Sequence, residues 1–260
     1  MLLALPIGML IGLSLGALGG GGSILTVPAL VYLLGQSAHS ATAASLIIVG
    51  ITAIAGMAVH LRAGRVRVRS GIAFGVLGAG GAFAGSRLSA SINPNALLVA
   101  FSVLMAAAAV MMLRRKRPAG PAGPAGPAGH AGTASSVSPV RVVVAATVVG
   151  LVTGFFGVGG GFVVVPALVL ALGFDMPTAV GTSLLVIAIN SASALLSRLG
   201  THVSVGYALV ATFTVAAVAG AVAGSRIASK VRPGRLAGAF AVLMVLIALY
   251  TTARSVTALA

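Results

Sequence analysis

The chain has 260 residues, of which 59% are hydrophobic and 7% are charged, and its mean hydropathy is +1.17. Soluble domains carry about 25% charged residues, so this composition excludes a soluble domain and predicts a polytopic protein of the lipid bilayer. There are 16 Lys and Arg but a single acid, Asp175, which gives a formal charge of +15. The basic residues lie between apolar stretches and are not interleaved with aromatic residues, so they indicate membrane topology and no nucleic-acid partner.

The first apolar stretch, residues 2–35, is too long for one transmembrane helix. A helix crosses a core of roughly 30 Å with about 20 residues, whereas an unbroken helix here would measure roughly 50 Å. Four consecutive glycines occupy residues 19–22, and each glycine costs a helix interior about 1 kcal/mol. The stretch therefore predicts a discontinuous element: a helical arm, a glycine turn, and a short second arm at about 24–34.

Single membrane spans are predicted next, at 43–61, 71–90 and 96–113. The first half then ends with the basic run 114–117, and four Pro-Ala-Gly triplets follow at 118–129. These triplets are too few for a collagen helix, so they predict a flexible, partly extended spacer. The predicted organisation is a first transmembrane repeat at 1–117, a linker at 118–139 and a second transmembrane repeat at 140–260.

The second half repeats the first. Residues 142–172 are again over-long, roughly 46 Å as one helix, and predict a short arm at about 162–172. Single spans follow at 179–197, 205–225 and 236–252. At an offset of 138, Gly19, Gly21, Gly22 and Pro28 correspond to Gly157, Gly159, Gly160 and Pro166. An apolar unit duplicated with glycine breaks is typical of transporters whose binding site lies at the repeat interface. The fold class is therefore all-α, with two homologous halves and about eight hydrophobic segments.

The basic residues predict that the halves are inverted. Arg62, Arg65, Arg67 and Arg69 follow the span at 43–61, whereas the corresponding loop of the second half has only Arg198. The next loop reverses this pattern, with Arg87 alone in the first half and Arg226, Lys230, Arg232 and Arg235 in the second. If each broken element turns back on itself, 13 of the 16 basic residues share a side, and otherwise the split is 11 to 5. The positive-inside rule favours the first arrangement, with the linker in the cytoplasm.

The glycine turns are the candidate binding site. A helix N-terminus carries about half a positive charge and unpaired N–H groups, so two short arms that begin near mid-membrane would bind an anion. The alternative is that these glycines only permit close helix packing. The candidate substrate-binding residues of the turns are Gly19, Gly20, Gly21, Gly22, Ser23, Gly157, Gly159, Gly160 and Gly161.

Polar residues in the spans that follow the turns are further candidates for substrate binding: Ser45, Thr182, Ser183 and Asn190. A hydroxyl in a helix can bond a ligand or merely a backbone carbonyl one turn back, whereas an amide is costlier to bury unpaired. Gating is a weaker expectation for Pro28 and Pro166, and for Arg87 and Arg226 of the repeated Ala-Gly-Ser-Arg motif. For the arginines, the alternative is snorkelling to the membrane interface.

The sequence also lacks several chemical groups. The predicted spans contain no Asp or Glu, which argues against a metal or organic cation as substrate. Asp175 is expected to cap a turn. The four histidines, at 39, 60, 130 and 202, lack metal-ligand spacing, so we expect no metal site and interfacial or solvated imidazoles. No GxSxG, HExxH or Walker motif is present, so we expect neither an enzyme nor a cofactor.

The motifs together resemble the sulfite exporter TauE/SafE family. The resemblance lies in GxGGGxxxxPxL at 157–168, its looser copy GGGGSILTVPAL at 19–30, the polar segments AxxASL and VGTSL that start the following spans, and the two AGSR motifs. It covers essentially the whole chain except the linker. It implies a secondary transporter or permease in the plasma membrane of a prokaryotic-type cell, for sulfite, sulfoacetate or other sulfur-containing or organic anions. Ser23, where the second repeat has Gly161, departs from the pattern and leaves open whether both turns contribute equally to binding.

We therefore expect an exporter of a small anion, such as sulfite or an organosulfonate, that works by alternating access. An anion channel, and a non-transporting membrane subunit that recruits a partner through its basic loops, are the alternatives. The expected partners are the small anionic substrate and the lipid bilayer, and assembly as a homo-oligomer stays open.

Overall fold

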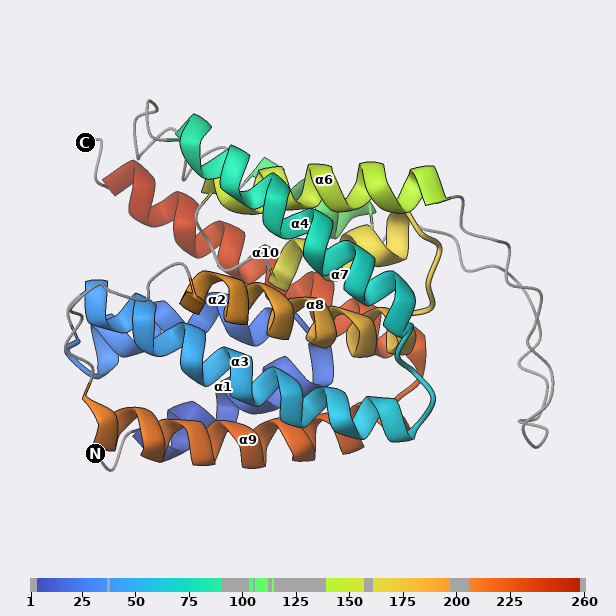
Figure 1. Cartoon of the computed structure of the whole chain (residues 1–260). Helices are drawn as coiled ribbons and strands as arrows, with labels where there is room; N and C mark the ends of the chain where they lie inside the picture. Colours follow the sequence, from blue (N-terminus) through green and yellow to red (C-terminus); the bar gives the residue numbers. More distant parts are fainter. Residues whose placement is uncertain are drawn as a thin grey trace.

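The computed structural model describes residues 4–36, 38–89, 103–104, 106–111, 114, 139–156, 161–196 and 206–257, and within them every regular element is a helix (Figure 1). This confirms the predicted all-helical architecture. Three of the described helices are long and apolar enough to cross a bilayer, namely Ser40–Arg62, Met176–Leu196 and Ala208–Lys230. The chain is therefore built as a membrane protein.

The helices agree with the predicted segments. They are α1 (Ala4–Leu18), α2 (Gly21–Pro28), the π-helical turn η1 (Ala29–Leu33), α3 (Ala38–Arg62), α4 (Val68–Ser89), α6 (Pro139–Phe156), α7 (Gly161–Leu170), α8 (Met176–Leu196), α9 (Tyr207–Lys230) and α10 (Pro233–Thr257). Both over-long stretches are divided as predicted, the first into α1 and α2 and the second into α6 and α7. The predicted span at 96–113 lies largely outside the described residues, and the Pro-Ala-Gly triplets lie wholly outside them.

The first break falls at Gly19. Its φ of +75° lies in the left-handed region, which residues with a side chain rarely adopt. Its N–H donates to the Leu15 carbonyl at 2.8 Å and so closes the last turn of α1. The short arm begins at Gly21 and not at residue 24 as predicted, because Gly22 is held in the helix by packing against Ile11 and Leu15 of α1.

After the break, the short arm turns back along α1. Leu25, Pro28 and Leu33 line the same groove as Ile7 and Leu10, so later residues of the arm lie beside earlier residues of α1. The two arms therefore form a helical hairpin with the glycine turn at its tip.

Both short arms end in the same hydrogen-bonded turn. Gly35 and Gly173 have φ values of +65° and +76°. Just beyond them, Gln36 N donates to Leu30 O at 3.0 Å and Phe174 N donates to Leu168 O at 3.1 Å. Glycine in this conformation commonly closes the C-terminal end of a helix. The three pairs of residues are each 138 apart, so the duplicated sequence forms the same local structure twice.

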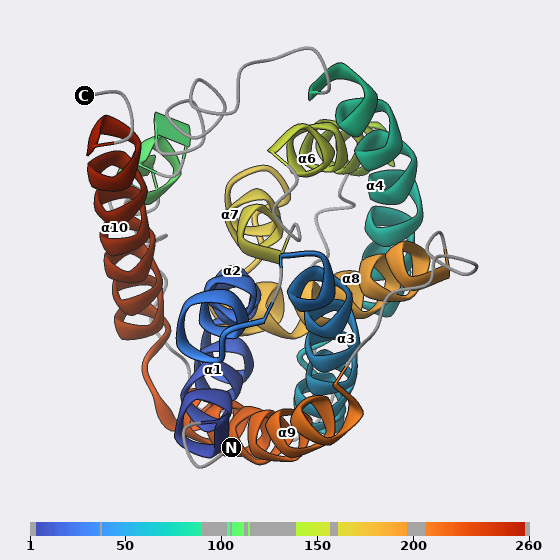
Figure 2. The same ribbon diagram turned by 90° about the vertical axis from the view of Figure 1, so that its left-hand side faces the viewer.

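Each half of the chain packs its first helix against a helix of the other half. The first half's α1 packs along α9 of the second, and α6 of the second packs along α4 of the first (Figures 1 and 2). At these contacts a Cβ added to the glycine would collide with the facing backbone, so small residues let the helices approach closely. The contacts recur at the offsets of the sequence repeat: Gly12 with Ala217 matches Gly150 with Gly78, and Gly220 with Met9 and Leu13 matches Gly81 with Thr147 and Leu151.

The same contacts give the directions of the helices. Along α1 and α9 the residue numbers rise together, since Gly8 meets Phe213 and Gly16 meets Ala221. In contrast, α3 and α8 run in opposite directions, and their close contacts are Gly50 with Ser191 and Gly56 with Leu184.

The apolar core beside the first turn joins three helices. It consists of Leu15 of α1, Val49 and Ala53 of α3, and Leu184 and Ile187 of α8, all buried. Apolar side chains are also exposed on the outside of the molecule, as a lipid environment requires, for example Leu10, Val76, Phe83 and Val215.

Candidate functional site

The starts of the two short arms face each other. Ser23 of α2 and Gly161 of α7 are equivalent residues at the offset of 138. A Cβ added to Gly161 would lie 2.6 Å from the Ser23 Oγ and 2.8 Å from the Ile187 Cδ1. The structure thus brings two of the predicted site residues together, one from each half, at a place that is closed to solvent.

The first glycine turn also contacts α8. A Cβ added to Gly19 would collide with the Ser183 Oγ and would lie 2.9 Å from the Val165 Cγ2 of α7. Ser183 is fully buried. The tip of the first hairpin therefore contacts two helices of the second half.

The three serines predicted for the site bond to backbone carbonyls three residues earlier. Ser23 donates to Gly20 O at 2.7 Å, Ser45 to Thr42 O at 2.8 Å, and Ser183 to Val180 O at 2.8 Å. Because a serine hydroxyl has one proton, each must rotate away from its carbonyl before it can donate to an anion. In this conformation they present acceptor oxygens, and donors toward an anion must come from backbone N–H groups.

Thr182 has a different position from its neighbour. Its side chain is fully buried, and its Oγ1 accepts a hydrogen bond from the Arg67 backbone N at 3.1 Å. Thr182 therefore attaches α8 to the loop between α3 and α4, whereas Ser183 contacts the glycine turn.

Asn190 has an equivalent residue that the sequence reasoning missed. Its Oδ1 is buried and has no hydrogen-bond partner within the described residues, and the same holds for the Oγ1 of Thr52. Thr52 lies 138 residues before Asn190 and is 1% exposed. Leaving a buried polar atom unpaired costs about 1–3 kcal/mol. Comparing the two halves at this offset would have identified Thr52.

The remaining predicted residues are the other glycines of the turns, the two prolines and the two arginines. Gly21 packs against Leu243 of α10, Pro28 ends α2 directly before the π-helical turn, and Pro166 is buried within α7. Arg226 is exposed near the end of α9. Gly20 separates α1 from α2. Gly157, Gly159 and Gly160, and the side chain of Arg87, lie outside the described residues.

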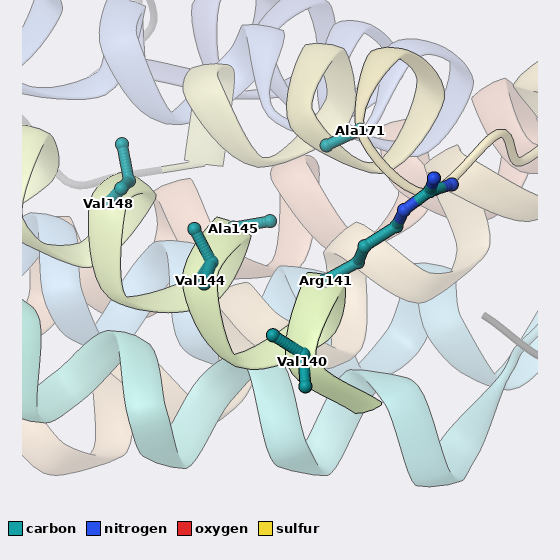
Figure 3. Close-up of a pocket in the computed structure, with 6 residues that line it drawn as sticks. All are labelled: Val140, Arg141, Val144, Ala145, Val148 and Ala171. Carbon is teal, nitrogen blue, oxygen red and sulfur yellow. The ribbon is translucent and has the colours of Figure 1, made fainter. Parts of the chain in front are cut away.

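Two grooves of the structure lie on the outer faces of the hairpins. Three lining residues of each are equivalent, since Ile7, Leu10 and Leu33 correspond to Ala145, Val148 and Ala171. One groove has a volume of about 470 Å³, and the other has about 370 Å³, with Arg141 extended across one end (Figure 3). Their linings are otherwise apolar and would not replace the hydration of an anion, so they are not part of the candidate site.

Two expectations for titratable residues have different outcomes. Asp175 caps the start of α8 as predicted, because Thr178 N donates to its Oδ2 at 3.4 Å. The prediction of a solvated or interfacial imidazole is wrong for His60, which is 2% exposed because α1 ends against it. Its Nε2 lies 3.2 Å from Gly16 O, and the Ser225 Oγ donates to the same carbonyl at 3.2 Å. Among the described residues, no cluster of three His, Cys, Asp or Glu side chains is placed to hold a metal ion.

Comparisons with known proteins find one family model and several relatives that match most of the chain. Residues 4–251 match the family model described as "Sulfite exporter TauE/SafE". A "Probable membrane transporter protein" of Xylella fastidiosa is 32% identical over 253 residues, which cover 95% of this chain and 93% of the relative. The "Probable membrane transporter protein YunE" of Bacillus subtilis is 27% identical over 223 residues, covering 80% and 79% of the two chains. No solved structure matches.

Proposed function

The chain belongs to the sulfite exporter TauE/SafE family of membrane transporters, and we propose that it exports a small anion, sulfite or an organosulfonate, across the plasma membrane by alternating access. The relatives are named as membrane transporters, and the proposed activity is transport without a chemical reaction.

The contact of Ser23 with Gly161 carries the proposal. It joins the first turns of α2 and α7, and each turn has backbone N–H groups that lack a partner within their helix. The partial positive charges of both helix ends meet there, in a protein whose single acid caps a turn elsewhere. The partial positive charges of the helix ends favour a negative charge at this place. Thr52 and Asn190, with unpaired buried oxygens, supply polar atoms to the helices beside it.

We infer that the halves are inverted repeats. The contacts of α3 and its counterpart α8 support this, because these helices lie side by side and run in opposite directions. Because α1 packs on α9 and α6 packs on α4, a rocking motion of one half against the other would change the contacts of α1 and α6 together.

Transport is tested with purified protein in liposomes. Saturable uptake of radiolabelled sulfite that accelerates when unlabelled sulfite is preloaded inside would support a carrier, since a channel shows no such acceleration. Competition by organosulfonates would then rank the substrates. Uptake no faster than in empty liposomes, from protein that elutes as a folded species, would overturn sulfite as the substrate.

The assignment of the site is tested by Gly161→Leu, with Gly80→Leu as the matched control. Both glycines are helical, but a Cβ at Gly161 meets Ser23 and Ile187, whereas a Cβ at Gly80 meets nothing within 4 Å. We expect Gly161→Leu to insert in the membrane but to abolish uptake, and Gly80→Leu to transport normally. Normal uptake by Gly161→Leu would overturn the assignment.

A further inference from the structure

The buried imidazole of His60 has a defined hydrogen-bonding state. Its Nε2 lies 3.2 Å from the Gly16 carbonyl oxygen, which can only accept. Nε2 therefore carries a hydrogen, and Nδ1 is the nitrogen that can take up a further proton. The substrate site assigned above does not use this group, and no metal or acidic partner explains its burial within the described residues.

The end of α1 stabilises a proton on His60. Gly16 lies in the last turn of α1, where carbonyl groups lack helical partners and carry a partial negative charge. These carbonyls favour an imidazolium, whereas burial of the ring and the nearby Arg65 oppose it, so the imidazole is neutral at rest. Ser225 of α9 donates to the same oxygen.

The other charges around His60 are positive. Neither α1 nor α8 contains a titratable residue, and Asp175 precedes α8. On the loop, Arg65 donates its backbone N–H to His60 O at 3.0 Å, and its guanidinium reaches Ser229 O at 3.5 Å. The end of α9 adds Arg226 and Lys230, and the end of α3, the loop and the start of α4 add Arg62, Arg67 and Arg69 in turn. These cations repel the positive charge of a protonated His60. An anion bound nearby would offset that repulsion and so favour proton uptake by His60.

A four-residue segment of α8 links His60 to the glycine turn. On one side, Val180 and Ser183 contact Gly19. On the other, a Cβ added to Gly181 would lie 3.0 Å from the His60 Cβ and 2.5 Å from Arg65 O. The first glycine turn and His60 thus pack against the same short segment of α8. A displacement of this segment would change the contacts of both.

We propose that His60 is a proton-binding site coupled to anion binding at the first glycine turn, so that a proton crosses the membrane with the anion. This rests on the proposed transport function. The proton enters Nδ1 from the water on the side where the anion binds and leaves to the other side with it. Linkage makes the coupling reciprocal: the anion favours the proton by the same factor as the proton favours the anion. In the second half the equivalent residue is Arg198, a permanent cation.

The test uses methanesulfonate and a pH-sensitive dye inside liposomes. Sulfite itself exchanges a proton near neutral pH, whereas a sulfonate keeps its charge and carries no proton of its own. Potassium with valinomycin clamps the membrane potential, so that anion entry does not draw protons through the lipid. We expect methanesulfonate uptake by the unaltered protein to acidify the lumen. In His60→Gln the amide N–H can still donate to Gly16 O but cannot take up a proton, so acidification should be lost. Ser225→Ala, which removes the other donor to Gly16 O, should still acidify.

The outcomes separate the two proposals. Unchanged acidification in His60→Gln, or uptake by the unaltered protein without acidification, would overturn the role of His60 while transport stands. If neither sulfite nor methanesulfonate is transported, the proposed function fails, and NMR of ¹⁵N-histidine-labelled protein then decides on the proton site. A resonance that is absent from His60→Gln and titrates between about pH 5 and 8 would support it. An imidazole signal that stays unchanged over that range would overturn it.

Discussion

Gly19 lies so close to Ser183 that a Cβ added to it would overlap the serine hydroxyl. The two residues belong to different halves, so the turn of the first hairpin and the start of α8 must move together. The structure provides a control for testing this contact, because Gly35 has a similar positive φ and nothing within 4 Å of its added Cβ.

We therefore predict different results for Gly19→Ala and Gly35→Ala. Both place alanine in the left-handed region, which costs about 1–2 kcal/mol. Only Gly19→Ala adds the collision with Ser183, so its melting temperature in detergent should fall further and its sulfite uptake should be lost. Gly35→Ala should retain uptake. Equal effects of the two substitutions would mean that the backbone conformation alone matters at Gly19.

The contact between Ser23 and Gly161 predicts a partial rescue. Gly161→Ala should reduce uptake strongly, because the new Cβ lies 2.6 Å from the Ser23 Oγ. Adding Ser23→Gly removes that oxygen. The double variant then has the glycine at residue 23 and the larger residue at 161. The double variant should recover part of the uptake, though not all, since Ile187 still lies 2.8 Å from the Cβ. If the effects of the two substitutions on uptake simply add, Ser23 and Gly161 are not in contact in the transporting protein.

The unpaired Thr52 hydroxyl predicts a gain of stability with a loss of function. Thr52→Val removes a buried oxygen that has no partner among the described residues and should stabilise the protein by about 1 kcal/mol. If the oxygen contacts the substrate, uptake should fall at the same time. Thr212→Val is the control, because the Thr212 Oγ1 donates to Ala208 O at 2.8 Å, so no stabilisation is expected there. A destabilised Thr52→Val with normal uptake would indicate a purely structural hydroxyl.

The broken helices could be predicted from the sequence, because helix breaking is a local property of glycine. The residue at which the short arm begins could not, because Gly21 and Gly22 are held in α2 by Leu243 and by α1, and tertiary packing overrides propensity. Likewise, the offset of 138 predicts that Ser23 and Gly161 are equivalent but not that they touch.

The residues beyond the turns were harder to predict. Small residues allow α1 to approach another helix closely, but their pattern does not identify α9 as the partner. The burial of His60 follows from that partnership, since α1 ends against it, and so does its bond to the Gly16 carbonyl. Thr52 was missed because a single threonine in a helix bonds its own backbone more often than a ligand.

The absence of cysteine from the chain makes the proposed inversion directly testable. Ala63 follows α3 and Gly206 precedes α9, both are exposed, and they lie in corresponding loops of the two halves. If the halves are inverted, a membrane-impermeant thiol reagent should label Ala63→Cys only from the cytoplasmic side and Gly206→Cys only from the outside. Labelling of both from one side would mean that the halves are parallel, and the motion proposed for alternating access would lose its basis. Because each variant carries one thiol, the background is the unaltered protein, which should not be labelled from either side.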